Sequence, residues 1–257
     1  MTYRNLLIIA TGLAFMASCT RIVDSDVPKT ENWNSYQTEQ YTFYVRPGSL
    51  AEDSIEAIKT EQEWAYREIN RRLELSFDRK LQVYIYNSEE DMGATNRTGK
   101  AYPELATIEA IYSPEIKSIG ARGVSLHELS HIAVFYGWCP TPQPLFAEGL
   151  AVWLDNYWND PSVNSTSLFR VSRAHLRQGN LPDVERMMNQ WNQMSATYSY
   201  PTAGSFAKYL IDQYGLDSYK ALYCEARPDN FSSVFYDIYQ TEIRTVEREY
   251  RSFLEDK

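Results

Sequence analysis

A proline-rich connector between two apolar helical segments is the feature that most constrains how this chain can fold. Residues 125–136 and 145–157 both show the spacing of apolar side chains that predicts an α-helix. The connector between them, residues 137–144, contains three prolines and cannot continue either helix. We therefore expect the second helix to fold back antiparallel to the first.

The first of these helices carries the pattern HExxH, with His127, Glu128 and His131 at its fixed positions. Side chains four residues apart lie on the same face of a helix, so the two imidazoles can bind one metal ion. Glu128 lies about 100° further around the axis, where it reaches a water on that metal rather than the metal itself. The chain has only three histidines, so this spacing rarely arises by chance. The pattern predicts a zinc site in which Glu128 is the general base.

A catalytic zinc site needs a third protein ligand. The extended pattern that supplies a third histidine fails here, because Val134 and Gly137 stand at its Gly and His positions. Glu148 lies 17 residues after His131 among apolar neighbours on the second helix, and a carboxylate in that setting needs a partner. We therefore predict that His127, His131 and Glu148 bind one Zn²⁺ per chain.

The segments HELSH and FAEGLAVWLD resemble the gluzincin metallopeptidases, and the chain is most similar to the peptidase-MA-like lipoproteins of that group. The segments TIEAIY, 200–215 and 247–254 agree with this resemblance, which covers roughly residues 40–254. It implies a zinc metallopeptidase in which His127, His131 and Glu148 bind the metal and Glu128 is the base.

The resemblance also implies a tyrosine that stabilises the oxyanion, for which Tyr200 is the best match and Tyr198 the alternative. Asp155 follows Glu148 by two turns on the same face of the predicted helix, so it is a candidate acceptor for a ligand imidazole. His175 is expected to be a structural or surface histidine.

A second class of function is also compatible with the sequence, namely a catalytically silent zinc-binding module that contacts glycans or envelope partners through an aromatic groove. An intact Glu128 favours the enzyme, because a metal scaffold without activity does not need this base. Gluzincin aminopeptidases carry Gly-Ala-Met-Glu-Asn, whereas residues 93–96 read Gly-Ala-Thr-Asn. This difference favours an endopeptidase or a narrow specificity. The net charge of −9 disfavours a nucleic-acid partner, so we expect a peptide or protein substrate.

Residues 1–18 are predicted to be a lipoprotein signal peptide. Arg4 precedes an apolar run, 6–17, that suits a leader but is too short for a comfortable membrane span. The run ends in Met-Ala-Ser-Cys, which resembles a bacterial lipobox, so we expect a lipid on Cys19. Residues 19–40 would then tether the protein to the bacterial cell envelope, at the outer membrane and on its periplasmic or surface face. A plain secretory signal is the alternative.

The rest of the sequence predicts an α+β, zincin-like fold with a small mixed sheet packed on the HExxH helix. We expect one peptidase domain over residues 41–257, with an α+β half, 41–136, and a mainly helical half, 137–257. A helix follows the first strand and begins at Ser49 or Ser54. The predicted strands are 41–45, 81–86 and 107–112, and the further helices are 167–178, 202–214, 217–225 and 240–254.

Two cysteines, Cys139 and Cys224, remain beyond the predicted lipidation site. Neither lies in a Cys-x-x-Cys motif, so a cysteine-based metal site is not expected. An exported protein can join them in a disulfide, but their spacing does not show whether they lie close together. Their pairing and the oligomeric state stay open at the level of sequence.

Overall fold

The computed structural model describes residues 32–93, 98–114, 125–140, 142–155 and 167–256, which all belong to one compact unit of the chain, Glu31–Lys257. The predicted signal peptide, Cys19 and the first part of the predicted tether lie outside these residues. Within the described ranges, no helix has both the length and the apolar character needed to cross a lipid bilayer.

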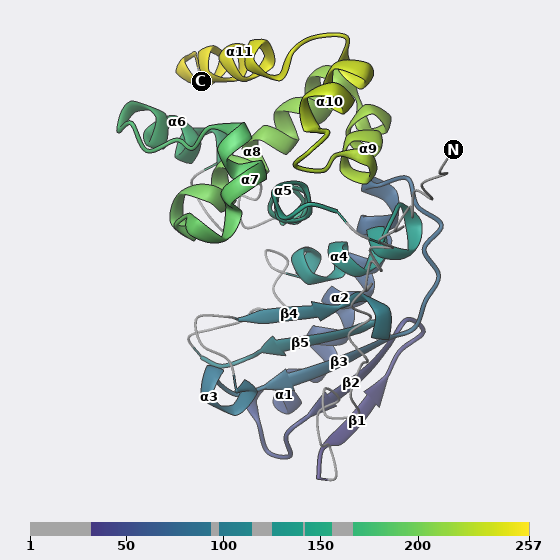
Figure 1. Cartoon of the computed structure of the whole chain (residues 1–257). Coiled ribbons are helices and arrows are strands. Elements are labelled where there is room, and N and C mark those ends of the chain that lie inside the picture. The colour runs from purple at the N-terminus through teal and green to yellow at the C-terminus, as the bar shows by residue number, and fades with distance from the viewer. Residues whose placement is uncertain (1–31, 94–97, 115–124, 141, 156–166, 257) are drawn as a thin grey trace, which may run out of the picture. The chain divides into compact units, whose positions relative to one another are not determined.

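Five short strands form a mixed β-sheet in the order β1-β2-β3-β5-β4 (Figure 1). The three central strands β2, β3 and β5 are parallel, and each outer strand is antiparallel to its neighbour. The alternation of β2 explains its place, since Tyr41, Phe43 and Val45 are fully buried while the residues between them are not. The bounds are β1 Asn34–Gln37, β2 Tyr41–Val45, β3 Leu81–Tyr86, β4 Gly99–Tyr102 and β5 Thr107–Ile111.

Two helices, α2 (Ile55–Arg72) and α4 (Ser125–Gly137), pack against each other and share one apolar core with the sheet. A short helix α1 (Leu50–Asp53) precedes α2. Both serines considered as helix starts are N-caps, Ser49 of α1 and Ser54 of α2. The Oγ of Ser49 accepts a hydrogen bond from the backbone N of Glu52, at 3.2 Å.

Helix α5 (Pro144–Leu154) follows the proline-rich connector and packs on α4. The sequence predicts this contact between the two helices. Pro144 begins α5, a position where the missing N–H of proline costs no helical hydrogen bond. Figure 1 shows α4 and α5 between the sheet and the remaining helices. These helices are α6 (Leu168–Arg177), α7 (Val184–Gln190), α8 (Ala196–Tyr214), α9 (Leu216–Glu225), α10 (Phe231–Tyr239) and α11 (Ile243–Glu255).

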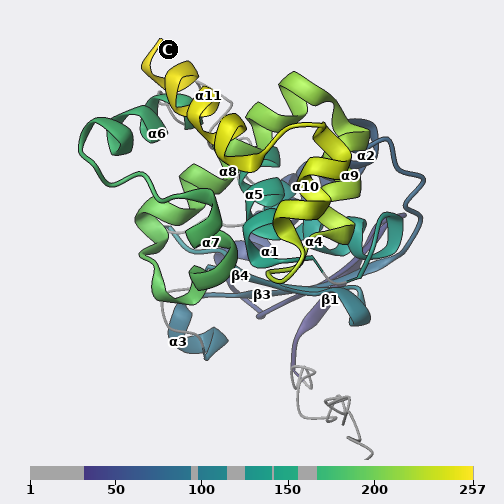
Figure 2. The same ribbon diagram turned by 45° about the horizontal axis from the view of Figure 1, so that its top comes forward.

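Helix α8 packs closely against α5 because glycines lie at the contact. A Cβ added to Gly149 of α5 would lie 2.9 Å from the carbonyl oxygen of Ala203, and one added to Gly204 of α8 would lie 2.5 Å from Cγ1 of Val152. Neither position has room for a side chain. Figure 2 shows α8 beside α5, with α9 and α10 next to them.

The strands predicted at 41–45 and 81–86 are confirmed, and the third ends at Ile111 rather than at residue 112. The prediction of a tether up to residue 40 is wrong for residues 34–37, which pair with β2 as strand β1. Strand β4 and the short helix α3 (Glu89–Met92) were not expected. The mixed α+β architecture and the helical second half agree with the sequence-based prediction.

Three helix predictions need correction. Helix α5 ends at Leu154 and not at residue 157. At this helix end, the backbone carbonyl of Leu154 accepts a hydrogen bond from Nη1 of Arg72 at 3.2 Å. Helix α8 begins at Ala196 rather than at 202, and it contains Pro201. The last predicted helix, 240–254, is α11, which begins at Ile243 and ends at Glu255, and neither α7 nor α10 was predicted.

Candidate metal centre

Helix α4 presents two histidines on one face. The opposite face carries Leu126, Leu129 and Ile132, which are fully buried and fix the helix in the core. The side chains of His127 and His131 are 18% and 17% exposed, and their ring centroids lie 5.2 Å apart. The sequence predicted this shared orientation from the four-residue spacing.

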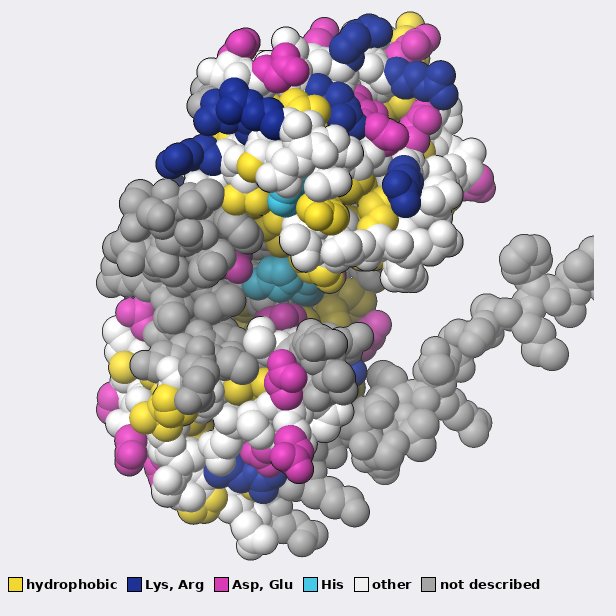
Figure 3. Space-filling view, turned by 90° about the vertical axis from the view of Figure 1, so that its left-hand side faces the viewer, with side chains coloured by type: hydrophobic (Ala, Val, Ile, Leu, Met, Phe, Trp, Pro, Cys, Tyr) yellow, Lys and Arg dark blue, Asp and Glu magenta, His cyan; other side chains and the backbone are white. Residues whose placement is uncertain are grey.

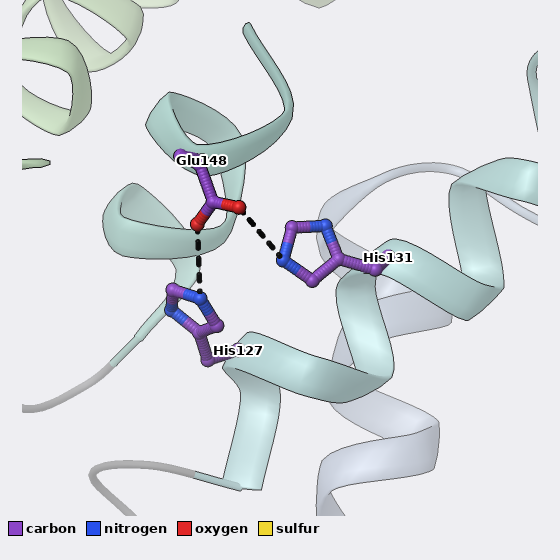
Figure 4. Close-up of side chains that lie close together, drawn as sticks. All are labelled: His127, His131 and Glu148. Atoms are coloured by element: carbon purple, nitrogen blue, oxygen red, sulfur yellow. Dashed lines mark ion pairs between the residues drawn. The ribbon is translucent and has the colours of Figure 1, made fainter. Parts of the chain in front are cut away.

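Glu148 of α5 lies opposite the two imidazoles (Figure 4). Its Oε2 is 3.4 Å from Nε2 of His127, and its Oε1 is 3.9 Å from Nε2 of His131. One ligand atom from each residue lies within 4.8 Å of the others. Two ligands of a tetrahedral zinc, each about 2 Å from the ion, are roughly 3.3 Å apart, so the spacing of these atoms suits such a metal.

The two histidines differ in their response to this setting. Burial lowers the pKa of both imidazoles, and for His131 this effect prevails. For His127, the hydrogen bond to Glu148 and the charges of Glu128, Glu148 and Asp155 outweigh burial and raise the pKa to about 9. The acidic groups around His127 thus favour a positive charge at this position.

Glu128 lies against the backbone of strand β4. A Cβ added to Gly99 would lie 2.8 Å from Oε1 of Glu128 and 3.0 Å from its Cγ. Any side chain at position 99 would therefore require the carboxylate to shift. Glu128 therefore lies between the candidate metal ligands of α4, His127 and His131, and the edge of the sheet.

These groups line a cleft of about 770 Å³. Its walls include β4 on one side, the connector and α5 on another, and residues of α8 and α9. Figure 3 shows histidine side chains in this hollow, with Asp or Glu beside them. The volume lies in the range of ordinary ligand-binding sites.

The cleft distinguishes the two tyrosines that the sequence left open. Tyr200 of α8 lines the cleft, and its ring lies 5.3 Å from that of Trp191. Tyr198 contacts His175 instead, with ring centroids 5.0 Å apart. His175 lies in α6 and does not belong to the candidate cluster of His127, His131 and Glu148. Tyr200 is therefore the residue that the fold brings to the cleft of Glu128 and Glu148.

Asp155 also lines the cleft, but its backbone is not helical as the sequence predicts. It is not a helical residue two turns beyond Glu148 but the C-cap of α5, with φ −62° and ψ 115°. Asp has weak helix propensity, and the chain leaves the helix at this residue. Asp155 is 6% exposed and lines the cleft, and its charge contributes to the raised pKa of His127.

Sequence reasoning missed three contributors to the cleft. Gly99 belongs to a strand that has no β-branched or aromatic run and is recognised only by its pairing with β5. Tyr223 of α9 lines the cleft from a helix remote in the sequence. Cys139 and Cys224 form a disulfide, with Cα atoms 5.8 Å apart, and Cys139 lines the cleft as well.

Comparisons of the chain with protein-family profiles and with curated protein sequences found no match.

Proposed function

We propose that this chain is a zinc-dependent peptidase of zincin-like fold. The observation that carries the proposal is the convergence of His127, His131 and Glu148 in an open cleft, beside the carboxylate of Glu128. Two imidazoles and one carboxylate are a common ligand set of catalytic zinc, and three protein ligands leave one position for water or substrate.

Each residue of the cluster has a distinct role in this proposal. Zinc held by His127, His131 and Glu148 would supply a Lewis acid that polarises the substrate carbonyl and lowers the pKa of the attacking water. Glu128 accepts the proton of that water and later delivers it to the leaving amine. The hydroxyl of Tyr200 donates a hydrogen bond to the carbonyl oxygen as negative charge develops there. Asp155 orients a ligand imidazole.

The edge of the sheet supports a peptide as the substrate. Among the described residues, β4 is the last strand on its side of the sheet and pairs only with β5. Three of its residues, Gly99, Lys100 and Ala101, line the cleft. An extended peptide can pair with the backbone of such an edge strand, which would carry one of its peptide bonds past Glu128.

The first experiment separates metal binding from catalysis. Protein truncated after Cys19 is purified without added metal, analysed for zinc, and profiled on a peptide library with and without a chelator. We expect about one zinc per chain. His127→Ala and Glu148→Ala should lose zinc together with activity. Glu148→Ala protein that binds zinc as tightly as wild type would exclude Glu148 as a ligand.

Glu128→Gln tests the base. It nearly preserves shape, so zinc content and melting temperature should stay, while hydrolysis should fall at least about 100-fold. Glu104→Gln, which removes an exposed carboxylate outside the cleft, is the matched control and should keep full activity. Glu128→Gln protein as fast as wild type would show that another group is the base. Wild type that binds zinc and cleaves nothing would favour the silent zinc-binding module.

A further inference from the structure

Tyr223 has a hydroxyl that the fold does not use. The residue is 1% exposed, and its exposed part belongs to the cleft wall. Among the described residues, its hydroxyl has no hydrogen-bond partner. Tyr219, one turn earlier and equally buried, instead donates a hydrogen bond to the carbonyl of Phe146 at 3.2 Å.

The phenol of Tyr223 is a hydrogen-bond donor in the part of the cleft that holds Glu148. Burial, and then the negative charge of Glu148, raise the pKa of Tyr223 well above its ordinary value. The hydroxyl therefore keeps its proton at any working pH and can donate it to an acceptor. The backbone carbonyl groups of a peptide are acceptors of this kind.

Two adjacent contacts hold this side chain in place. The ring of Trp138 meets the ring of Tyr223 edge-on, with centroids 5.3 Å apart. The next residues along each segment, Cys139 and Cys224, form the disulfide. Two consecutive residues of the connector are thus fastened to two consecutive residues of α9. We call this arrangement the 138/223 clasp.

We propose that Tyr223 contacts the substrate, donating a hydrogen bond from its hydroxyl to a backbone carbonyl of the peptide bound beside Glu148, and that the 138/223 clasp positions it. The inference rests on the proposed peptidase function. It assigns the clasp to the substrate site, in addition to any contribution it makes to stability.

A pair of variants on the same helix tests the contact. Tyr223→Phe keeps the ring against Trp138 and breaks no hydrogen bond between residues that the structure describes. Its melting temperature and zinc content should match wild type, while kcat/KM on a peptide found in the library should fall about tenfold, the upper range for one neutral hydrogen bond. Tyr219→Phe should do the reverse, because it loses the bond to Phe146: a lower melting temperature with kcat/KM unchanged.

Equal kcat/KM for Tyr223→Phe and wild type overturns the inference and leaves the proposed function standing. A wild-type protein that binds zinc but cleaves no peptide overturns both. The two failures are therefore distinguishable, because the first requires an active wild-type enzyme.

The positioning role is tested by combining variants. Cys139→Ser/Cys224→Ser should lower kcat/KM at unchanged zinc content, and adding Tyr223→Phe should then cost less than about twofold, because the hydroxyl is already misplaced. A full tenfold loss in that background would show that the clasp does not position Tyr223. If the double serine variant does not fold, Trp138→Ala opens the same clasp with the disulfide intact.

Discussion

At the scale of single residues, the placement of Glu128 in the cleft depends on Gly99, which has no Cβ. The carboxylate of Glu128 lies so close to Gly99 that a Cβ at this position would be only 2.8 Å from Oε1. Glycine at position 99 therefore provides space for this placement of the carboxylate, and its role here is not backbone freedom. The proposed base lies against the strand on which a peptide would align.

Gly99→Ala should displace the base without touching the metal ligands. The added methyl group would lie 2.8 Å from Oε1 of Glu128, so the carboxylate must move. Because small displacements of a reacting group cost large factors in rate, we expect a loss of at least about tenfold in kcat at unchanged zinc content.

Gly137→Ala is the control for that variant. Its methyl group would lie 2.6 Å from Cδ2 of Leu75, an equally close contact that does not involve Glu128. The control should lower the melting temperature but not kcat. Full activity in Gly99→Ala protein would mean that Glu128 has freedom to move and still serve as the base.

At the scale of helices, the close contact of α5 with α8 connects two parts of the proposed site. Glu148 and Val152 lie one turn apart on α5. Tyr200 and Gly204 lie one turn apart on α8. The glycine contacts set the distance between these helices. They therefore also set how far the tyrosine hydroxyl lies from the metal ligands.

Gly204→Ala should push α8 away from α5. Its methyl group would meet Cγ1 of Val152, and such overpacking costs about 1–3 kcal/mol of unfolding free energy. Hydrolysis should fall with it, because Tyr200 moves, while zinc stays bound. Adding Val152→Ala makes room and should restore both quantities at least in part, as measured by urea unfolding and kcat. No recovery in the double variant would contradict this account.

The sequence predicted those elements whose pattern is local. Strands β2 and β3 consist of aromatic and β-branched residues, and the HExxH helix has its own apolar face, so each is recognisable without the rest of the fold. Strand β4, read as Gly-Lys-Ala-Tyr, is a strand only through its pairing with β5. Helix α8 begins before its apolar pattern does, because α5 packs on it and overrides the signal of Pro201.

The candidate site shows the same difference between residues that a local pattern predicts and residues that distant packing brings together. His127, His131 and Glu148 follow from spacing along two helices joined by a short connector. Tyr223 and the partner of Cys139 depend on where α9 returns, and a pattern along the chain does not contain that information. Distant contacts are fixed by the packing of the whole core, which sequence periodicity does not describe.

At the scale of the whole molecule, the N-terminus is predicted to hold the proposed enzyme at the cell envelope. This prediction comes from the apolar run that ends at Cys19, outside the described residues. Cys19→Ser should leave the protein without lipid, so that it leaves the membrane fraction or keeps its leader. Fractionation and mass spectrometry of the mature N-terminus measure this. Mature protein with an unmodified Cys19, cut elsewhere, would rule out the anchor.

The disulfide between Cys139 and Cys224 gives the molecule an order of assembly. The candidate metal ligands lie close together in the sequence, on two neighbouring helices, whereas the cysteine partners are 85 residues apart. During synthesis the metal ligands can meet before α9 exists, and the covalent closure waits for an oxidising compartment. A chain still inside a reducing cytosol can therefore bring its candidate metal ligands together before the disulfide joins the connector to α9. In the proposed peptidase, this delay would limit hydrolysis of the cell's own proteins until the predicted export.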